Sequence, residues 1–338
     1  MRRYLSLIIL LLTLGVSSCE HKDLCYNHRD HAHRYHVNIV ADYRYDWEEY
    51  CGGINWQEVW PEDYIPYDDL RPDAPSGLRV VNFNKEGGYN VHNIKPNGGV
   101  IMLYEGVNDL LFYNNDTEYI IFSRSSDGVT TRATTRTRTR ATYFGSEFAT
   151  PNEVTVAPPD MLYANFFENY VAERVVDPAE VKVTLQPLVF TYKIRYEFES
   201  GLQYVSMVRG ALSGMAKEVL LNTGETSEET ATILYDCEMT DYGARAIINS
   251  FGTPGYPNPN YPTRADIKHA LNLEVMLRNG KMLTFDFDVT DQLRTQPHGG
   301  VIVVDGIVID KQIAEEGSGA FDVGVDDWGD YEPVPLPI

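Results

Sequence analysis

The stretch that decides the fold runs from Val181 to Glu199 and reads VKVTLQPLVFTYKIRYEFE. After Pro187, apolar and polar residues alternate almost without a break, which would place one set of side chains on each face of an extended strand. Such alternation is typical of an antiparallel sheet with one buried and one solvated face. We therefore expect a long strand here, and we place the start of a C-terminal domain near residue 180.

Shorter runs of the same kind lie on both sides of this stretch. They are rich in β-branched or aromatic residues and are bounded by Gly, Asn, Asp or Pro. No amphipathic helix of useful length separates them, which favours an all-β protein built from antiparallel sandwiches. The expected strands are 35–42, 78–84, 89–94, 99–105, 109–113 and 118–122 in the N-terminal half, and 204–212, 217–221, 230–237, 271–277, 282–289 and 301–309 in the C-terminal half.

The N-terminus carries a targeting pattern. Arg2 and Arg3 precede an apolar run from residue 5 to residue 14, and residues 14–19 read LGVSSC. A basic start, a short apolar core and small residues before a cysteine predict a lipoprotein signal peptide over residues 1–18, with lipidation of Cys19. The alternative is an ordinary secreted protein in which Cys19 merely follows the cleavage site.

The mature chain is long enough for two domains of typical size. We predict a lipidated tether over 19–34, an N-terminal β-sandwich domain over 35–180 and a C-terminal β-sandwich domain over 181–338. Histidines are frequent in and just beyond the tether, and Cys25, His28, His31 and His33 could ligate zinc. Their spacing matches no standard zinc module, so we interpret the segment as a polar tether, with neither metal nor cofactor.

Charge and cysteine content exclude several classes of protein. Removal of residues 1–18 takes away two arginines and no acidic residue, which changes the net charge from −21 to −23. So acidic a surface argues against nucleic acid as a partner. Because it would also be repelled by anionic membrane surfaces, we expect the lipid alone to attach the protein to the membrane. After Cys19, only Cys25, Cys51 and Cys237 remain, so the chain is no disulfide-dense scaffold, and the sequence fixes no pairing among them.

One basic tract stands out in this acidic chain. Residues 130–142 read TTRATTRTRTRAT, with arginines at Arg132, Arg136, Arg138 and Arg140. The tract could be a site for a trypsin-like protease, a dock for an acidic partner, or a solvated loop or sheet edge. We expect an exposed, protease-sensitive loop.

Residues 42–77 are rich in tryptophan, tyrosine and acids. Trp47, Trp56 and Trp60 could form a stacking platform for a glycan, or could belong to a long loop that packs its rings over a sheet. We favour the packing interpretation and keep glycan binding as the alternative.

Catalytic motifs are absent from the sequence: it contains no G-x-S-x-G, H-E-x-x-H, phosphate-loop or C-x-x-C pattern. Asp286 and Asp288 alternate with Phe285 and Phe287, which predicts a strand with one wet face rather than an EF-hand calcium loop. We therefore expect a protein that is not an enzyme.

Several stretches resemble the outer-membrane lipoproteins of Bacteroides-type bacteria that are related to FimB-like anchor and accessory subunits of type V fimbriae. The resemblance covers nearly the whole mature chain. It rests on the lipobox with residues 25–28, and on residues 45–48, 60–62, 70–80, 113–119, 134–140, 158–164, 212–216 and 285–292.

This resemblance implies two transthyretin-like sandwich domains, a lipid anchor at Cys19 and a place on the outer membrane at the cell surface. It also implies fimbrillin-type pilin subunits as partners, joined by strand exchange, in which an extended segment of one subunit completes the sheet of its neighbour. The segment expected to act as an exchanged or edge strand is the tail WGDYEPVPLPI, with Trp328, Tyr331, Val334, Leu336 and Ile338. Its three prolines would remove backbone donors that such an exchange uses.

Overall fold

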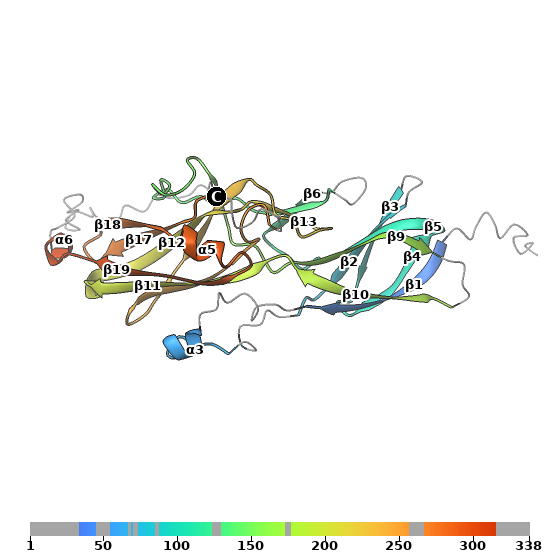
Figure 1. Cartoon of the computed structure of the whole chain (residues 1–338), viewed down its shortest axis with the longest axis horizontal. Coiled ribbons are helices and arrows are strands. Elements are labelled where there is room, and N and C mark those ends of the chain that lie inside the picture. Colours follow the sequence, from blue (N-terminus) through green and yellow to red (C-terminus); the bar gives the residue numbers. More distant parts are fainter. Residues whose placement is uncertain are drawn as a thin grey trace, which may run out of the picture.

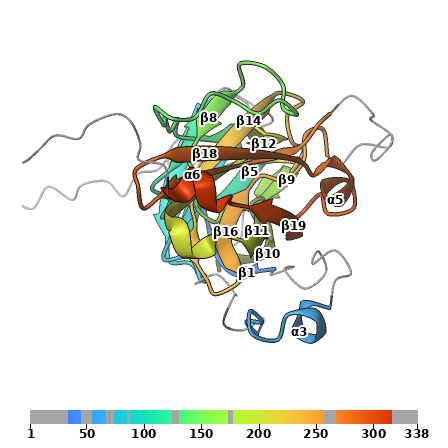
Figure 2. The ribbon, with the colours of Figure 1, turned by 90° about the vertical axis from the view of Figure 1, so that its left-hand side faces the viewer.

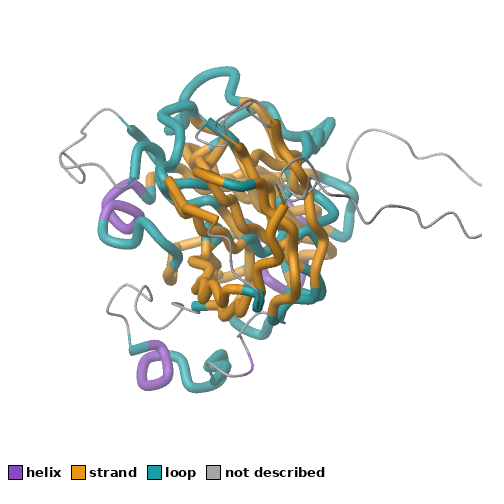
Figure 3. Tube along the Cα trace, turned by 90° about the vertical axis from the view of Figure 1, so that its right-hand side faces the viewer, coloured by secondary structure: helices purple, strands orange, loops and turns teal. Residues whose placement is uncertain are grey.

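A computed structural model describes residues 34–44, 55–66, 69, 74–84, 88–123, 130–172, 177–256 and 267–315. Strands dominate this part of the chain, and the few helices are short (Figure 1). The all-β prediction is confirmed. The two halves lie end to end along the long axis (Figure 1), and a view along that axis shows strands filling the centre with helices at the margin (Figure 3).

The N-terminal half is one seven-stranded sheet in the order β3-β2-β5-β9-β10-β1-β4. Its strands are β1 (Arg34–Tyr43), β2 (Leu78–Asn84), β3 (Gly88–Ile94), β4 (Gly98–Tyr104), β5 (Gly106–Asn114), β9 (Tyr163–Ala172) and β10 (Ala179–Pro187). β9 and β10 pair through only two residue pairs, so the sheet folds there into two layers. Alternate residues such as Val37, Val80, Ile101 and Val183 point between the layers and form the N-terminal core.

The C-terminal half is a sandwich of a four-stranded sheet, β15-β16-β11-β19, and a five-stranded sheet, β18-β17-β12-β14-β8. Its elements are β8 (Val154–Val156), β11 (Phe190–Ser200), η2 (Leu202–Tyr204), β12 (Val205–Ala216), β14 (Thr230–Asp236), β15 (Glu238–Met239), β16 (Gly243–Ser250), β17 (Ala270–Leu277), β18 (Met282–Asp288), α5 (Thr290–Arg294), β19 (Gly300–Val308) and α6 (Lys311–Glu315). Tyr192, Ile194 and Tyr196 of β11 are fully buried in its core, as their alternation predicts. Phe285 and Phe287 also pack against this core.

The predicted long strand over 181–199 is in fact two strands, one in each half. β10 pairs with β1, and β11 pairs with β16 and β19. The break follows Pro187, which has no N–H with which to continue a ladder. The chain therefore crosses between the halves at residues 188–189.

A third layer joins the halves. β6 (Ile120–Ser123), β7 (Arg132–Thr135) and β13 (Glu218–Leu220) form a small sheet in the order β13-β7-β6. It covers a separate core that draws Val81 and Tyr113 from the N-terminal sheet and Ala216 and Phe251 from the C-terminal half. Since β8 also pairs in parallel with β14, residues 130–157 pack with the C-terminal half although β9 and β10 follow them in the N-terminal sheet. The two halves are interlocked.

Candidate functional site

The two terminal strands of the N-terminal sheet, β3 and β4, are consecutive in the chain. Lys95 and Gly98 form the one bridge between them in the described residues, and from there β3 pairs with β2 while β4 pairs with β1. The turn needs glycine, because Gly98 has a φ of +117° and a Cβ at this position would lie 2.0 Å from the carbonyl oxygen of Ile39. We call the region between these two strands the edge seam.

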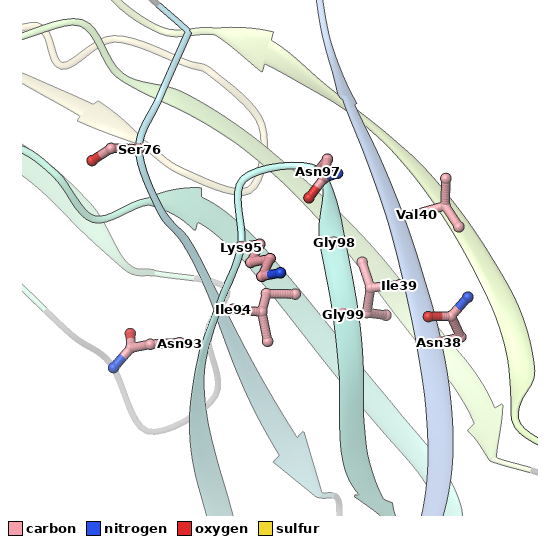
Figure 4. A pocket seen from close by; sticks show the side chains of 10 residues that line it. All are labelled: Asn38, Ile39, Val40, Ser76, Asn93, Ile94, Lys95, Asn97, Gly98 and Gly99. Carbon is pink, nitrogen blue, oxygen red and sulfur yellow. The ribbon is translucent and has the colours of Figure 1, made fainter.

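A hollow of about 790 Å³ lies at the closed end of the edge seam. Figure 4 shows its side chains arising from β1, from the end of β3, from the turn and from the start of β4. The lining residues are Asn38, Ile39, Val40, Ser76, Asn93, Ile94, Lys95, Asn97, Gly98 and Gly99. Amides, a hydroxyl and one ammonium group over an aliphatic floor can hydrogen-bond peptide groups, but they offer no nucleophile paired with a base.

Apolar side chains are exposed along both strands of the edge seam. On β4, Val100 is 55% exposed and Met102 40% exposed, and on β3 the values are 57% for Tyr89 and 37% for Val91. Neither strand contains Asp, Glu, Lys or Arg, although these residues make up 23% of the chain. Terminal strands are usually protected by charge or proline, so this region has the composition of an interaction site.

The arginine tract does not form one exposed loop. Arg132 lies in β7, between β6 and β13, and its guanidinium is 3.5 Å from the Glu218 carboxylate. Arg136 is exposed, and its backbone N–H donates to the carbonyl oxygen of Tyr119. The exposed-loop interpretation therefore does not hold for Arg132, because a partner strand more than eighty residues later in the sequence pairs with it.

The second half of the tract is fastened to the C-terminal five-stranded sheet. Arg138 contacts Asp236 at 2.8 Å, with both side chains substantially exposed. Arg140 contacts Glu274 at 2.9 Å, and the two side chains are only 7% and 1% exposed. Arg140 also donates to the carbonyl oxygens of Gly210 and Tyr235. The exposed-loop interpretation is thus wrong for Arg140 as well.

The tryptophan platform is not assembled as a binding surface. Trp56 is 6% exposed, and its ring lies 4.0 Å from the Lys193 ammonium on the outer face of β11. The ring of Trp60 lies 5.2 Å from the Arg195 guanidinium. The packing interpretation is confirmed for Trp56, whose ring is not available for glycan stacking. Trp47 lies outside the described residues, as do Cys19 and the tail residues Trp328, Tyr331, Val334, Leu336 and Ile338.

Sequence reasoning did not identify the polar residues of the hollow or the buried carboxylate of Asp63. Asn38, Asn93 and Asn97 come from three separate segments, so no local pattern unites them. In the described ranges, no group of three or more His, Cys, Asp or Glu side chains is arranged to hold a metal ion. None of the described helices is long and apolar enough to cross a bilayer.

These features define an all-β protein of two interlocked halves with an uncharged, partly exposed edge seam. Residues 67–236 match the model of a domain of unknown function, DUF5119, over half of the chain. The chain therefore belongs to the DUF5119 family. No protein with a curated description matches its sequence.

The chain was compared with solved structures. A candidate adhesin from Bacteroides ovatus superposes with a TM-score of 0.60 at 20% identity, over 83% of this chain and 94% of its own. A candidate polysaccharide-binding protein from Bacteroides thetaiotaomicron gives 0.46 at 9% identity, over 80% and 91%. The fimbrial anchor protein Mfa2 from Porphyromonas gingivalis gives 0.41 at 11% identity, over 80% and 90%. Of these three, only the first score is high enough to indicate a common fold.

Proposed function

We propose that this protein is a cell-surface lipoprotein that acts as a fimbrial anchor or accessory subunit and assembles with pilin subunits by β-strand addition. The observation that carries the proposal is the edge seam, in which two consecutive terminal strands diverge around a hollow. The fold shared with a candidate adhesin is consistent with such a role. The proposed role requires no catalytic residue.

Strand addition explains the chemistry of the edge seam. An added strand obtains affinity from main-chain hydrogen bonds and specificity from alternate side chains that meet the receiving sheet. β4 places Val100 and Met102 on its outer face and carries no charge that would repel such a strand. The amides of Asn93 and Asn97 lie at the closed end, where they could hold the end of an incoming segment.

Two further parts of the proposal concern residues outside the described ranges. Cys19 would carry the lipid that holds the protein on the outer membrane, facing the cell surface. The tail from Trp328 to Ile338 would be the segment that this protein offers to a fimbrillin-type partner. The two fimbrial contacts would then use different strands, one received at the edge seam and one donated by the tail.

Val100→Lys tests the receiving edge. A lysine on the outer face of β4 should block strand addition and leave the N-terminal core unchanged, because Val100 points away from it. The matched control is Val171→Lys on β9, since Val171 is 54% exposed and β9 lies three strands from either terminal strand. Tagged proteins would be recovered from outer membranes in mild detergent, and their partners identified by mass spectrometry.

We expect a fimbrillin-like subunit to accompany the wild-type protein and Val171→Lys, and to be lost from Val100→Lys. Equal recovery with all three proteins would contradict the edge seam as the receiving site. A glycan-binding surface lipoprotein of a polysaccharide uptake system, the alternative from the sequence, gains no support from the buried Trp56.

A further inference from the structure

A short segment of the N-terminal half lies across the C-terminal half. Residues 55–66, which include α3 (Trp56–Val59), come between β1 and β2 in the sequence. Figure 1 nevertheless shows α3 below β11, and Figure 2 shows it on the side of β11 and β16 of the C-terminal four-stranded sheet. We call residues 55–66 the strap. No strap residue belongs to any of the three cores formed by the described residues.

The sheet face beneath the strap concentrates positive charge. Arg195 of β11 and Arg245 of β16 are directly opposite in the antiparallel register, and Lys193 precedes Arg195 on the same face. Lys193 is 3% exposed and Arg195 5% exposed. Like charges directly opposite on neighbouring strands repel each other, and buried cations need a fixed counter-charge. This face is therefore built to hold an anion.

The strap supplies that anion through Asp63, which is 4% exposed. Its two carboxylate oxygens lie 2.7 Å from Nη1 of Arg195 and 3.0 Å from Nη1 of Arg245. The Tyr242 hydroxyl donates to the same carboxylate, and the Lys193 ammonium donates to the backbone carbonyl oxygen of Asp63. Although burial opposes ionisation, these donors and the charge of Lys193 hold the pKa of Asp63 below its usual value.

Two indole rings complete the contact. Trp56 lies over the Lys193 ammonium and Trp60 over the Arg195 guanidinium, so each ring covers a cation that Asp63 also contacts. Trp56 is held in turn by an edge-to-face contact with Tyr64, at 5.0 Å between ring centroids. The sheet face thus recognises a carboxylate that follows aromatic residues at short spacing.

We propose that the outer face of β11 and β16 is a binding site for acidic peptide segments bearing tryptophan. In the resting chain the strap occupies this site and acts as a releasable latch. Release would leave all three cores intact, because the strap contributes to none of them. It would also uncover Lys193, Arg195 and Arg245 on a chain whose net charge is −21, and so provide a docking point for an acidic, aromatic partner segment. Arg195 would keep its contact with Glu197 at 2.6 Å and Arg245 its contact with Glu238 at 2.9 Å, so the carboxylate of the partner would replace that of Asp63 alone.

Asp63→Asn tests the latch in the full mature chain. The substitution keeps the shape of the side chain and removes the charge that Arg195 and Arg245 share. The matched control is Glu62→Gln, because Glu62 is 53% exposed and contacts Arg195 only at 3.4 Å. Chymotrypsin, which cuts after aromatic residues unless proline follows, would report release through cleavage after Trp56 or Tyr64.

We expect Asp63→Asn to be cut in the strap about a hundredfold faster than the wild-type protein, and Glu62→Gln to be cut at nearly the wild-type rate. Far-UV circular dichroism should be the same for all three proteins. Tyr242→Phe, which removes one donor to Asp63, should give an intermediate rate and keeps the test decisive if Asp63→Asn fails to fold.

A synthetic peptide of residues 55–66 tests the binding site itself. It should bind the Asp63→Asn protein, whose site is open, and not the wild-type protein, whose site is filled. The same peptide with Asn in place of Asp63 should bind at least about tenfold more weakly. Equal binding of the two peptides to the Asp63→Asn protein, or strap cleavage of that protein at the wild-type rate, would overturn the proposal.

Discussion

Replacement of Arg140 by alanine should destabilise the protein far more than replacement of its neighbour Arg138. The Arg140 guanidinium is almost fully buried against Glu274, and it also binds two backbone carbonyl oxygens. The other carboxylate oxygen of Glu274, Oε1, is buried with no hydrogen-bond donor among the described residues. Loss of Arg140 would therefore leave the buried Glu274 carboxylate without its ion-pair partner.

The magnitude follows from that burial. Removal of one partner from a buried ion pair costs about 3–5 kcal/mol, whereas an exposed pair contributes about 0–1 kcal/mol. Arg138 and Asp236 form the exposed pair, at 38% and 65% side-chain exposure, and they contact the same sheet. We expect Arg140→Ala to lower the free energy of unfolding by about 3–5 kcal/mol and Arg138→Ala by about 1 kcal/mol.

Urea denaturation followed by circular dichroism measures both free energies of unfolding. The double variant Arg140→Met with Glu274→Gln provides a further check, because it removes both charges and should be less destabilised than Arg140→Ala alone. If Arg140→Ala and Arg138→Ala cost the same within about 1 kcal/mol, the buried pair does not fasten the tract to the sheet and the reasoning fails.

Three other predictions concern the same fold. Burial lowers the pKa of Lys193 from 10.5 to about 8, so the unfolded chain binds more protons than the folded chain between those pH values. The free energy of unfolding of the wild-type protein, measured by urea titration, should therefore rise relative to that of Lys193→Met by up to about 3 kcal/mol as pH increases from 8 to 10.5. Parallel plots of unfolding free energy against pH for the two proteins would contradict this. Burial likewise lowers the pKa of His269 from 6.5 to about 4, so the free energy of unfolding should fall as pH decreases through that range. His269→Leu should make this fall smaller. An unchanged dependence of unfolding free energy on pH would exclude this role for the imidazole. Trypsin should leave residues 130–142 intact in the folded protein and cut there after unfolding in urea, and cleavage after Arg136 under native conditions would restore the exposed-loop interpretation.

Much of the fold could be predicted from period-two alternation. The expected strand over residues 78–84 matches β2 at both ends, and those over 271–277 and 282–289 match β17 and β18 within one residue. β16 went unpredicted although Ala244, Ala246 and Ile248 face the core at alternate positions. Small alanines gave that strand too weak an apolar signal.

The interlock between the halves could not be predicted from local sequence. β7 is rich in Thr and Arg and buries only Ala133 as a core side chain, and it is a strand because β13 pairs with it from a distant part of the chain. The alternation of β11 predicts one buried and one solvated face, and Lys193 and Arg195 do lie on the face away from the core, but they are only 3% and 5% exposed. Nothing in that strand indicates that a strap about 130 residues earlier covers them.

The transthyretin-like character of the domains, the lipid on Cys19 and the role of the tail stay predictions, because they depend on finer detail or on residues outside the described ranges. The resemblance seen in the sequence to fimbrillin-type lipoproteins agrees with the shared fold of the candidate adhesin from Bacteroides ovatus. The two proposals predict partners of different kinds: a strand at the edge seam, and an acidic aromatic segment at the face beneath the strap.

The measurement that tests the proposed function most directly is recovery of the tagged wild-type protein from outer membranes in mild detergent, with mass spectrometry of what accompanies it. The account predicts a fimbrillin-like subunit that stays in complex during electrophoresis without heating and is lost with Val100→Lys. Recovery of the protein alone, or with an outer-membrane transporter and no pilin, would contradict a role as a fimbrial subunit.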